Sequence, residues 1–378
     1  MEQLKRFIDI WVPVTTCTLR CHYCYITHNH LFGGPLPKFK YDVPTFQKGF
    51  SKERLGGTCM INFCGGGETL LPPQMPQYIQ ALLAEGHYVM IVTNATVDKA
   101  FDEISKFPRE YLERLFFKFS YHYLELKKRN LFEKFFNNIR KMKESGASFT
   151  LEATPSDELI PYINEMKALA IKEVGAVNHI TVARDEHDLS TIPILTKMSP
   201  EDYKKTWSVF NSEFFDYKYS VFSQKRTEFC YAGDWTLFYN METGVLHQCY
   251  CSLWDQNIMD DVTKPIKFKA IGHYCQQPHC YNAHAFLTFG AIPEHISPTY
   301  ATIRNRICID GTEWLQPRMK AFMEQRLKYA NKEYSLEEKE AIDLEMQRIL
   351  RKRKMISLMK KPITKLQIIK NKILKSNK

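Results

Sequence analysis

Short β-rich runs alternate with amphipathic helical stretches through the first half of this 378-residue chain, and few architectures accommodate that order. The helical stretches, such as residues 131–146 and 159–175, end in glycine, which commonly terminates a helix. This alternation predicts an α/β fold with a parallel sheet. The six expected strands are Arg6–Val14, Thr58–Cys64, His87–Asn94, Phe116–Tyr123, Ser148–Thr154 and Asn178–Arg184.

Three of the eleven cysteines, Cys17, Cys21 and Cys24, lie directly after the first expected strand, in the segment TTCTLRCHYCYI. A structural zinc site is closed by four ligands, whereas a metal that performs chemistry keeps one position open. The spacing C-x3-C-x2-C therefore favours an iron–sulfur cluster with one iron free to bind a ligand. The alternative is a zinc site with three cysteines and one histidine. The candidate histidines are His22, His28 and His30.

The second expected strand runs directly into the turn CGGGETLL. Ligands collect at the carboxyl ends of parallel strands, which meet at one edge of the sheet. We therefore expect the cysteine loop and the glycine turn to lie on one face and to form a single cofactor site. Cys59 and Cys64, within the second strand, are interpreted as small buried hydrophobic residues.

With the cysteine motif after the first strand and GGGE after the second, the sequence resembles the radical SAM enzymes. The resemblance implies a partial (β/α)6 TIM-type barrel with a small C-terminal iron–sulfur module and a helical basic tail. It also implies that Cys17, Cys21 and Cys24 hold a 4Fe–4S cluster whose open iron chelates S-adenosylmethionine (SAM). Reductive cleavage of SAM would then give a 5′-deoxyadenosyl radical that removes a hydrogen atom from a substrate.

The same resemblance implies roles for several residues at the ends of the strands. Glu68 would accept from the SAM ammonium group, and Arg184 would meet the SAM carboxylate. Ser120 and Glu152 occupy positions of ribose-binding groups, and Thr69 stands where the family often has proline. The full set of implied cofactor-binding residues is Tyr23, Gly66, Gly67, Glu68, Asn94, Ser120, Glu152 and Arg184.

Residues 226–296 form a second region, rich in cysteines, aromatic residues and turns. Cys230 and Cys249 bracket an expected hairpin with the turn NMETG, and Cys275 and Cys280 follow. This pattern resembles the auxiliary-cluster (Twitch/SPASM-like) modules of some radical SAM enzymes. It implies one auxiliary 4Fe–4S cluster, ligated by these four cysteines.

Other ligand sets stay open in this region. Cys251 is an alternative to Cys249, and a structural zinc site is an alternative to the cluster. Cys251 and Cys308 are also candidate hydrogen donors to a substrate radical, although Cys308 is interpreted as an inert thiol. The histidines that could replace a cysteine ligand are His273, His279 and His284.

The formal charge of +10 is concentrated at the C-terminus, because residues 351–378 hold eleven Lys or Arg and no acid. The interspersed Ile, Leu and Met residues permit an amphipathic helix on an anionic membrane surface, and a solvated tail is the alternative. Nucleic acid is not expected as a partner, because no stacking motif accompanies the charge. The expected divisions are 1–225 (partial barrel), 226–296 (auxiliary module), 297–350 (helical segment) and 351–378 (basic tail).

Cytoplasmic localisation is expected, because the N-terminus lacks a secretory signal and no apolar run is long enough to span a bilayer. Thiols stay reduced in that compartment, so the cysteines are not interpreted as a disulfide framework. The cysteine motif begins near the N-terminus, so no leader-peptide-binding domain is expected before it. A reducing partner such as flavodoxin or ferredoxin is expected.

The segment from Thr299 to Ser335 resembles the endings of radical SAM proteins of bacterial polysaccharide and capsule biosynthesis. This likeness implies oxidation or epimerisation of a small molecule such as an activated sugar, with Arg304 and Arg306 as candidates to receive its diphosphate. One alternative is a peptide- or protein-modifying radical SAM enzyme of the RiPP or sulfatase-maturase type. A second alternative is a non-catalytic, zinc-stapled binding protein.

Overall fold

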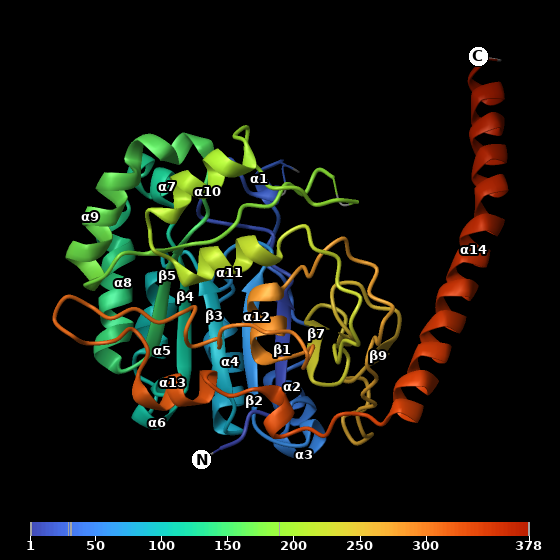
Figure 1. Cartoon of the computed structure of the whole chain (residues 1–378), viewed down its shortest axis with the longest axis horizontal. Helices are drawn as coiled ribbons and strands as arrows, with labels where there is room; N and C mark the ends of the chain where they lie inside the picture. The colour runs from blue at the N-terminus through green and yellow to red at the C-terminus, as the bar shows by residue number, and fades with distance from the viewer. Residues whose placement is uncertain (1, 29, 31, 189, 377–378) are drawn as a thin grey trace.

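The computed structural model describes residues 2–28, 30, 32–188 and 190–376, with the side chains of Tyr25, His28 and residues 357–376 excluded. Its central element is a nine-stranded sheet in the order β6-β5-β4-β3-β2-β1-β7-β8-β9 (Figure 1). The first six strands pair in parallel with their sequence neighbours, which confirms the predicted α/β class. The sheet is consistent with a partial TIM-type fold. These strands are β1 (Arg6–Val12), β2 (Cys59–Gly65), β3 (Tyr88–Thr93), β4 (Leu115–Ser120), β5 (Ser148–Ala153) and β6 (His179–Ile180).

The sixth strand is much shorter than predicted. Only His179 and Ile180 pair with β5, and Arg184 instead forms an isolated bridge with Ile194. The expected hairpin is present as β7 (Thr236–Asn240) and β8 (Val245–His247), followed by β9 (Asp255–Asn257). Because β7 also pairs in parallel with β1, the cysteine-rich region continues the main sheet. The division at residue 226 stays a prediction.

The helices precede, join or follow these strands. The first group is α1 (Tyr25–His28), α2 (Val43–Gly49), α3 (Lys52–Leu55), α4 (Met75–Ala84), α5 (Asp98–Ile104), α6 (Arg109–Leu112), α7 (Tyr123–Lys128) and α8 (Phe132–Ser145). The second group is η1 (Asp157–Tyr162), α9 (Ile163–Val174), α10 (Pro200–Ser208), α11 (Glu213–Val221), α12 (Ala283–Phe289), α13 (Pro317–Met323), η2 (Leu327–Tyr329) and α14 (Leu336–Ser376).

The sheet is covered on both faces, which explains why its strands are almost continuously hydrophobic. Side chains alternate between the faces along each strand. One set, including Ile8 and Ile61, packs in a core with helices α4, α5, α8 and α9. The alternate set, including Phe7, packs with α12, where Phe7 lies 5.7 Å from Phe286 and 5.2 Å from Phe289 between ring centroids. Helix α12 therefore covers the inner face of the sheet (Figure 1).

Helix α14 begins against the cysteine-rich region and then extends away from the body (Figure 1). Met346 is buried, and Asp343 accepts from His273 at 2.6 Å. Arg353 donates to the carbonyls of Ser252 and Leu253 at 2.9 and 3.0 Å. The membrane-contact prediction falls mainly on side chains outside the described residues, so it stays a prediction.

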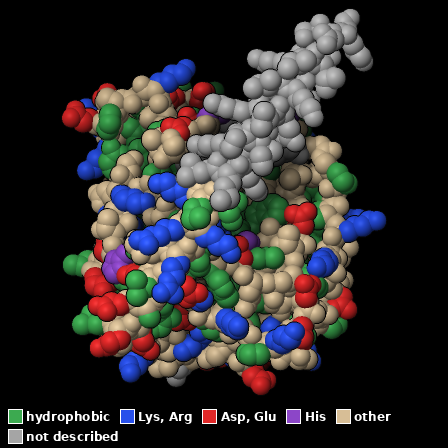
Figure 2. Space-filling view, turned by 90° about the vertical axis from the view of Figure 1, so that its right-hand side faces the viewer, with side chains coloured by type: hydrophobic (Ala, Val, Ile, Leu, Met, Phe, Trp, Pro, Cys, Tyr) green, Lys and Arg blue, Asp and Glu red, His purple; other side chains and the backbone are tan. Residues whose placement is uncertain are grey.

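On the face that Figure 2 shows, Lys and Arg side chains are interspersed with Asp and Glu. The described residues of this face therefore do not form one continuous basic patch. Within the described part of the chain, no helix is both long enough and apolar enough to cross a membrane.

Candidate functional site

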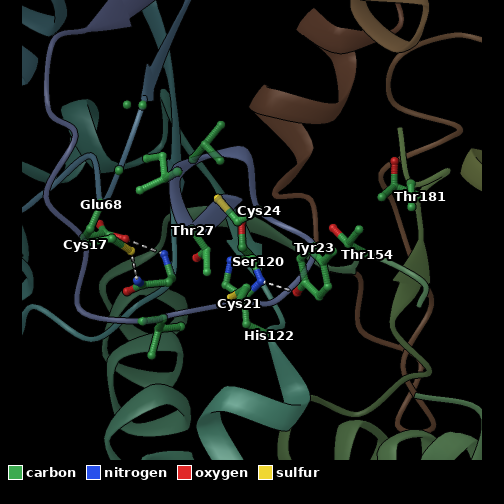
Figure 3. A pocket seen from close by; sticks show the side chains of 18 of the residues that line it. Cys17, Cys21, Tyr23, Cys24, Thr27, Glu68, Ser120, His122, Thr154 and Thr181 are labelled. Atoms are coloured by element: carbon green, nitrogen blue, oxygen red, sulfur yellow. Dashed lines mark hydrogen bonds between the residues drawn. The ribbon is translucent and has the colours of Figure 1, made fainter. Parts of the chain in front are cut away.

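A cavity of about 280 Å³ opens at the carboxyl ends of the parallel strands. The cysteine loop after β1, the glycine turn after β2 and the end of β3 all contribute to its wall, as the first two motifs predicted. Figure 3 shows the three cysteines and Glu68 on one side of it and Thr154 and Thr181 on the other. The predicted residues that line it are Cys17, Cys21, Tyr23, Cys24, Gly66, Gly67, Glu68, Asn94, Ser120 and Arg184.

The cysteine loop is held by backbone and charge contacts. The backbone N–H of Cys24 donates to the Cys21 carbonyl at 3.1 Å. The Arg20 guanidinium donates to the carbonyls of Cys17 and Leu19 at 2.5 and 2.8 Å. The Arg20 backbone N–H donates to Glu125 of α7 at 2.9 Å. The loop is thus anchored to itself and to the start of α7.

Burial raises the pKa of all three thiols, to about 11 for Cys17. They therefore hold their protons at neutral pH, and binding of a metal centre would release them. Three thiols that line one cavity fit the ligand set of an iron–sulfur cluster with one open iron.

The zinc alternative and the cluster both stay predictions. Among the described residues, no group of three or more His, Cys, Asp or Glu is arranged to hold a single metal ion. His22 lies at the surface, where its Nε2 is 2.9 Å from Glu158. The side chain of His28, another candidate fourth ligand, lies outside the described residues.

The glycine turn packs directly onto the chain that leads into the cysteine loop. The N–H of Gly67 donates to the Val14 carbonyl, and the N–H of Glu68 donates to the Thr16 carbonyl at 3.1 Å. A β-carbon on Gly67 would overlap Thr16, with the carbonyl carbon only 2.7 Å away. Glycine is therefore required here by a contact within the protein. Close approach of a cofactor, the sequence-based reason, stays a prediction.

Thr69 replaces the proline that the resemblance led us to expect, and the structure explains how the turn tolerates it. The Thr69 hydroxyl accepts from the backbone N–H of Gly65 at 2.8 Å. This bond closes the turn from within, since it joins the first glycine to the residue after the glutamate.

Glu68 is buried at the junction of β2 and β3. Its carboxylate accepts from the Thr93 hydroxyl at 2.6 Å and from the backbone N–H groups of Asn94 and Leu70 at 2.7 and 3.0 Å. Burial raises the pKa of this carboxyl group, although the three hydrogen bonds oppose the shift. Glu68 thus ties the glycine turn to the end of β3 and also lines the cavity.

Asn94 connects the end of β3 to the cysteine loop. Its Nδ2 donates to the Thr18 hydroxyl at 2.9 Å and lies 3.6 Å from Cys17 Sγ, and its Oδ1 accepts from the Thr96 hydroxyl at 2.6 Å. An N–H directed at a ligand sulfur tunes the potential of an iron–sulfur cluster.

Replacing Asn94 with leucine is expected to lower the midpoint potential of the first cluster, because the N–H that stabilises negative charge on Cys17 is lost. Spectroelectrochemical titration of the reconstituted protein measures this shift. The matched control is Asn138→Leu, since Asn138 is a buried neighbour that bonds to the Ala95 carbonyl and Asp98. Equal potentials in the wild type and Asn94→Leu would contradict the assignment.

Tyr23 lines the cavity as predicted, and its hydroxyl lies 2.6 Å from His122 Nδ1. Burial lowers the pKa of His122 to about 4, so this histidine is neutral at physiological pH. His122 was not anticipated, because it follows β4 without a recognisable motif. Lys218 of α11 was not predicted as a site residue either, because it follows the sixth strand by more than thirty residues. It is buried, lines the cavity and donates to the Thr181 hydroxyl at 2.7 Å.

Glu152 is placed differently from the prediction. It is not among the described residues that line the cavity, and its carboxylate is paired with the fully buried Arg304. Neither Arg304 nor Arg306 lines a described cavity: Arg306 donates to the carbonyls of Asn211 and Phe210 at 2.8 and 3.0 Å. Arg304 Nε and Nη2 and Arg306 Nε have no hydrogen-bond partner among the described residues, so the diphosphate contacts stay a prediction.

Arg184 lies at the cavity wall and is held by neighbours from two segments. Its guanidinium stacks 3.9 Å from the centroid of the Tyr281 ring, donates to the Tyr281 carbonyl at 3.1 Å and lies 3.3 Å from Glu186. Arg184 is thus kept beside the cavity although β6 ends before it.

Most of the later cysteines pack against the core that contains Phe7 and α12: these are Cys230, Cys249, Cys251 and Cys280. Cys251 Sγ lies 3.5 Å from Cys275 Sγ, and Cys230 forms a backbone bridge with Gly272. Burial and the neighbouring Cys230 and Cys275 thiols raise the pKa of Cys280. The Cys249 thiol also interacts with the thiols of Cys230, Cys275 and Cys280. The structure therefore brings five cysteines together, with Cys251 beside the predicted four.

The alternative histidine ligands are placed apart from one another. His273 is 2.6 Å from Asp343, and His279 stacks at 4.4 Å on Phe222, where burial lowers its pKa to about 4. His284 lines a second cavity together with Cys64.

Three cysteines outside the clusters were predicted to be packing residues. Cys59 is fully buried, as predicted. Cys308 is buried too, with its sulfur 3.4 Å from the Val174 carbonyl. Cys64 differs, because it is only partly buried and faces the second cavity.

Residues 11–154 match the family model described as Radical SAM superfamily. This range extends from the end of β1 to just past β5 and contains the cysteine loop, the glycine turn and Asn94. This part of the chain is therefore similar to the domain that radical SAM enzymes share. Enzymes of that superfamily carry out radical chemistry with a 4Fe–4S cluster and SAM, and for this chain that activity is a proposal.

Two solved structures are similar to this chain at low identity. SuiB of Streptococcus suis bound to S-adenosylmethionine is 14% identical, with a TM-score of 0.47 over 68% of this chain and 64% of that one. This chain thus spans just under two thirds of the SuiB length. The anSMEcpe structure with bound AdoMet and Cp18Cys peptide is 14% identical, with a TM-score of 0.46 over 69% of this chain and 79% of that one. No curated protein matches the chain.

Proposed function

We propose that this protein cleaves SAM reductively at the first cavity and uses the resulting radical to oxidise or epimerise a small polar molecule. The observation that carries the proposal is the convergence of three thiols, the glycine–glutamate turn and Asn94 on one cavity within the matched domain. A cluster with SAM bound there would supply the electron that breaks a carbon–sulfur bond of SAM.

The protein's own residues prepare this site. Cys17, Cys21 and Cys24 would hold the cluster, and Asn94 would donate to the Cys17 sulfur. Glu68 presents a carboxylate at the cavity wall for the SAM ammonium group. The glycine turn positions the cysteine loop by its hydrogen bonds to Val14 and Thr16.

The later cysteines are proposed to hold one auxiliary 4Fe–4S cluster, which would accept the electron released when a substrate radical is oxidised. Supporting this is the gathering of five half-buried thiols, one more than a cluster needs. A ferredoxin or flavodoxin is the proposed reductant. If a hydrogen atom is returned instead, Cys64 is the thiol that lines the second cavity, although the sequence analysis interpreted it as a packing residue.

Iron analysis combined with SAM turnover tests the proposal. Anaerobically reconstituted protein is expected to contain about eight irons per chain and to release 5′-deoxyadenosine under dithionite. The Cys275→Ala variant is expected to fall towards about four irons while keeping an electron paramagnetic resonance signal that changes on SAM addition. Colourless protein with zinc and without SAM cleavage would overturn the proposal in favour of a zinc-stapled binding protein.

Deuterium transfer then separates substrate classes. A deuterated nucleotide sugar that passes label into 5′-deoxyadenosine would identify an activated-sugar substrate. Label transfer only from a peptide would instead indicate a peptide-modifying enzyme.

A further inference from the structure

A second cavity, of about 150 Å³, lies against the inner face of the sheet beside the first. Val92 and Arg184 line both cavities, so the two spaces are neighbours. The strand pairings bring two rows of residues to its floor. The rows are Asp9, Asn62 and Met90, and Val92 and Lys118, and Cys64 of β2 also lines the cavity. The opposite wall comes from Tyr250, Tyr281, Asn282, His284, Ala285 and Tyr300.

Asp9 organises the polar part of this cavity. Its Oδ1 accepts from Asn62 Nδ2 at 2.6 Å, and its Oδ2 accepts from the Tyr250 hydroxyl at 2.6 Å and Asn282 Nδ2 at 2.9 Å. The two asparagines therefore use their amino groups on Asp9. Within the described part of the chain, their side-chain oxygens have no hydrogen-bond partner, although the residues are only 5% and 6% exposed.

Unpartnered buried acceptors are uncommon in folded proteins and cost about 1–3 kcal/mol each when left unsatisfied. Two such amide oxygens, on Asn62 and Asn282, belong to residues that line one small cavity, and so do two more unpartnered atoms, the Tyr300 hydroxyl oxygen and His284 Nδ1. A ligand that carries hydroxyl or amine groups would satisfy both amide oxygens.

Two cationic side chains line the cavity, Lys118 and Arg184, and Arg184 is paired with Glu186 at 3.3 Å. Lys118 differs from it. It is 9% exposed, and among the described residues its ammonium group has neither an ion-pair partner within 4.0 Å nor a hydrogen bond. A buried ammonium without a counter-ion is costly, and an anionic group of a ligand would compensate it. Asp9 does not form an ion pair with Lys118. Its carboxylate instead accepts hydrogen bonds from Asn62, Tyr250 and Asn282.

The volume limits what fits. An engineered cavity of similar volume in another protein binds benzene, so about six non-hydrogen atoms can enter here. An entire nucleotide diphosphate is too large. Only one end of such a molecule, or a small acid, would occupy the cavity.

We propose that the second cavity is a subsite for the substrate end that carries an anionic group, a carboxylate or a phosphate, next to hydroxyl or amine donors. Lys118 binds the anion, while the oxygens of Asn62 and Asn282 accept from the donors. Naming the ligand as substrate rests on the proposed function, whereas the binding chemistry does not. Tyr250 lies between Cys249 and Cys251 in sequence, and Tyr281 follows Cys280, so the subsite lies between the two cysteine groups.

Calorimetric titration of the full-length, anaerobically reconstituted protein tests this subsite with three probes. Glycerate has a carboxylate beside two hydroxyls, glycerol has the hydroxyls alone, and inorganic phosphate has the alternative anion. Glycerate or phosphate is expected to bind at least tenfold more tightly than glycerol. The tighter of the two anions identifies the acid class. Binding of glycerol as tight as that of both anions, or no binding of either anion, would overturn the proposal.

Two substitutions with opposite expected effects on the affinity for the anion test whether it binds at Lys118. Lys118→Met is expected to weaken binding of the anion at least tenfold, and Asp9→Asn is expected to tighten it because a negative charge is removed nearby. The control is Lys128→Met, the same change at an exposed position on α7. Unchanged affinity in both Lys118→Met and Asp9→Asn would overturn the proposal. If either variant fails to fold, the other still decides.

The same protein preparations distinguish failure of the proposed subsite from failure of the proposed SAM-cleaving function. Wild-type protein that binds the anion through Lys118 but cleaves no SAM would overturn the proposed function and leave the subsite supported. Wild-type protein that cleaves SAM but binds anions independently of Lys118 would overturn the subsite alone.

Discussion

The Cys21→Ala variant is expected to lose SAM cleavage entirely and to contain about four fewer irons per chain than the wild type. Cys21 is 6% exposed, and burial raises the pKa of its thiol, so its place in the cavity is fixed by packing. Removing one of only three ligands leaves a cluster with two, and water cannot restore a buried thiolate contact. Iron content and 5′-deoxyadenosine release under dithionite measure both effects.

The control for this substitution is Cys308→Ala. Cys308 is equally buried but lies beside the Val174 carbonyl, outside both cysteine groups. Its loss is expected to cost about 1 kcal/mol of stability and no iron. Normal SAM cleavage by Cys21→Ala would exclude this cysteine as a ligand of the catalytic cluster.

The second large effect is expected for Gly67→Ala, which adds one carbon to the turn after β2. That carbon would overlap the Thr16 carbonyl group, so the backbone that carries the cysteine loop must move. We expect the variant to lose most of its first cluster and about 1–3 kcal/mol of stability. Iron content, the SAM-dependent electron paramagnetic resonance signal and thermal unfolding measure the outcome.

Gly33→Ala is the matched control, because a β-carbon at Gly33 would meet no atom within 4 Å. It is expected to retain full iron and normal stability. A Gly67→Ala protein with a normal cluster would show that the contact between the glycine turn and Thr16 is not needed to place the cysteines.

The local motifs were predictable because their information lies within a few residues. Five of the six expected strands agree closely with the structure, since buried parallel strands are nearly continuous hydrophobic runs. The cysteine loop and the glycine turn follow such strands, and parallel pairing alone brings them to one edge of the sheet. For the same reason, Cys17, Cys21, Cys24 and Glu68 were expected at one cavity, and they line it.

Residues joined across long stretches of sequence were not predictable. Nothing near Asp9 indicates that it meets Tyr250 and Asn282, which follow it by 241 and 273 residues. Glu152 was expected at the cavity, yet Arg304 pairs with it from 152 residues away. Such contacts depend on how α12 and the following segment pack over the sheet, and no local pattern encodes that packing.

The amino-acid sequence alone was sufficient to predict the fold class and the first group of cysteines, because hydrophobic periodicity and cysteine spacing are local properties of the sequence. Packing in three dimensions decided the rest: β7 joins β1, and five later cysteines gather. It also brings Lys118, which has no ion-pair partner among the described residues, to the same cavity as the unpartnered amide oxygens. The physical reason is that burial and hydrogen-bond satisfaction are properties of the assembled interior, to which distant segments contribute together.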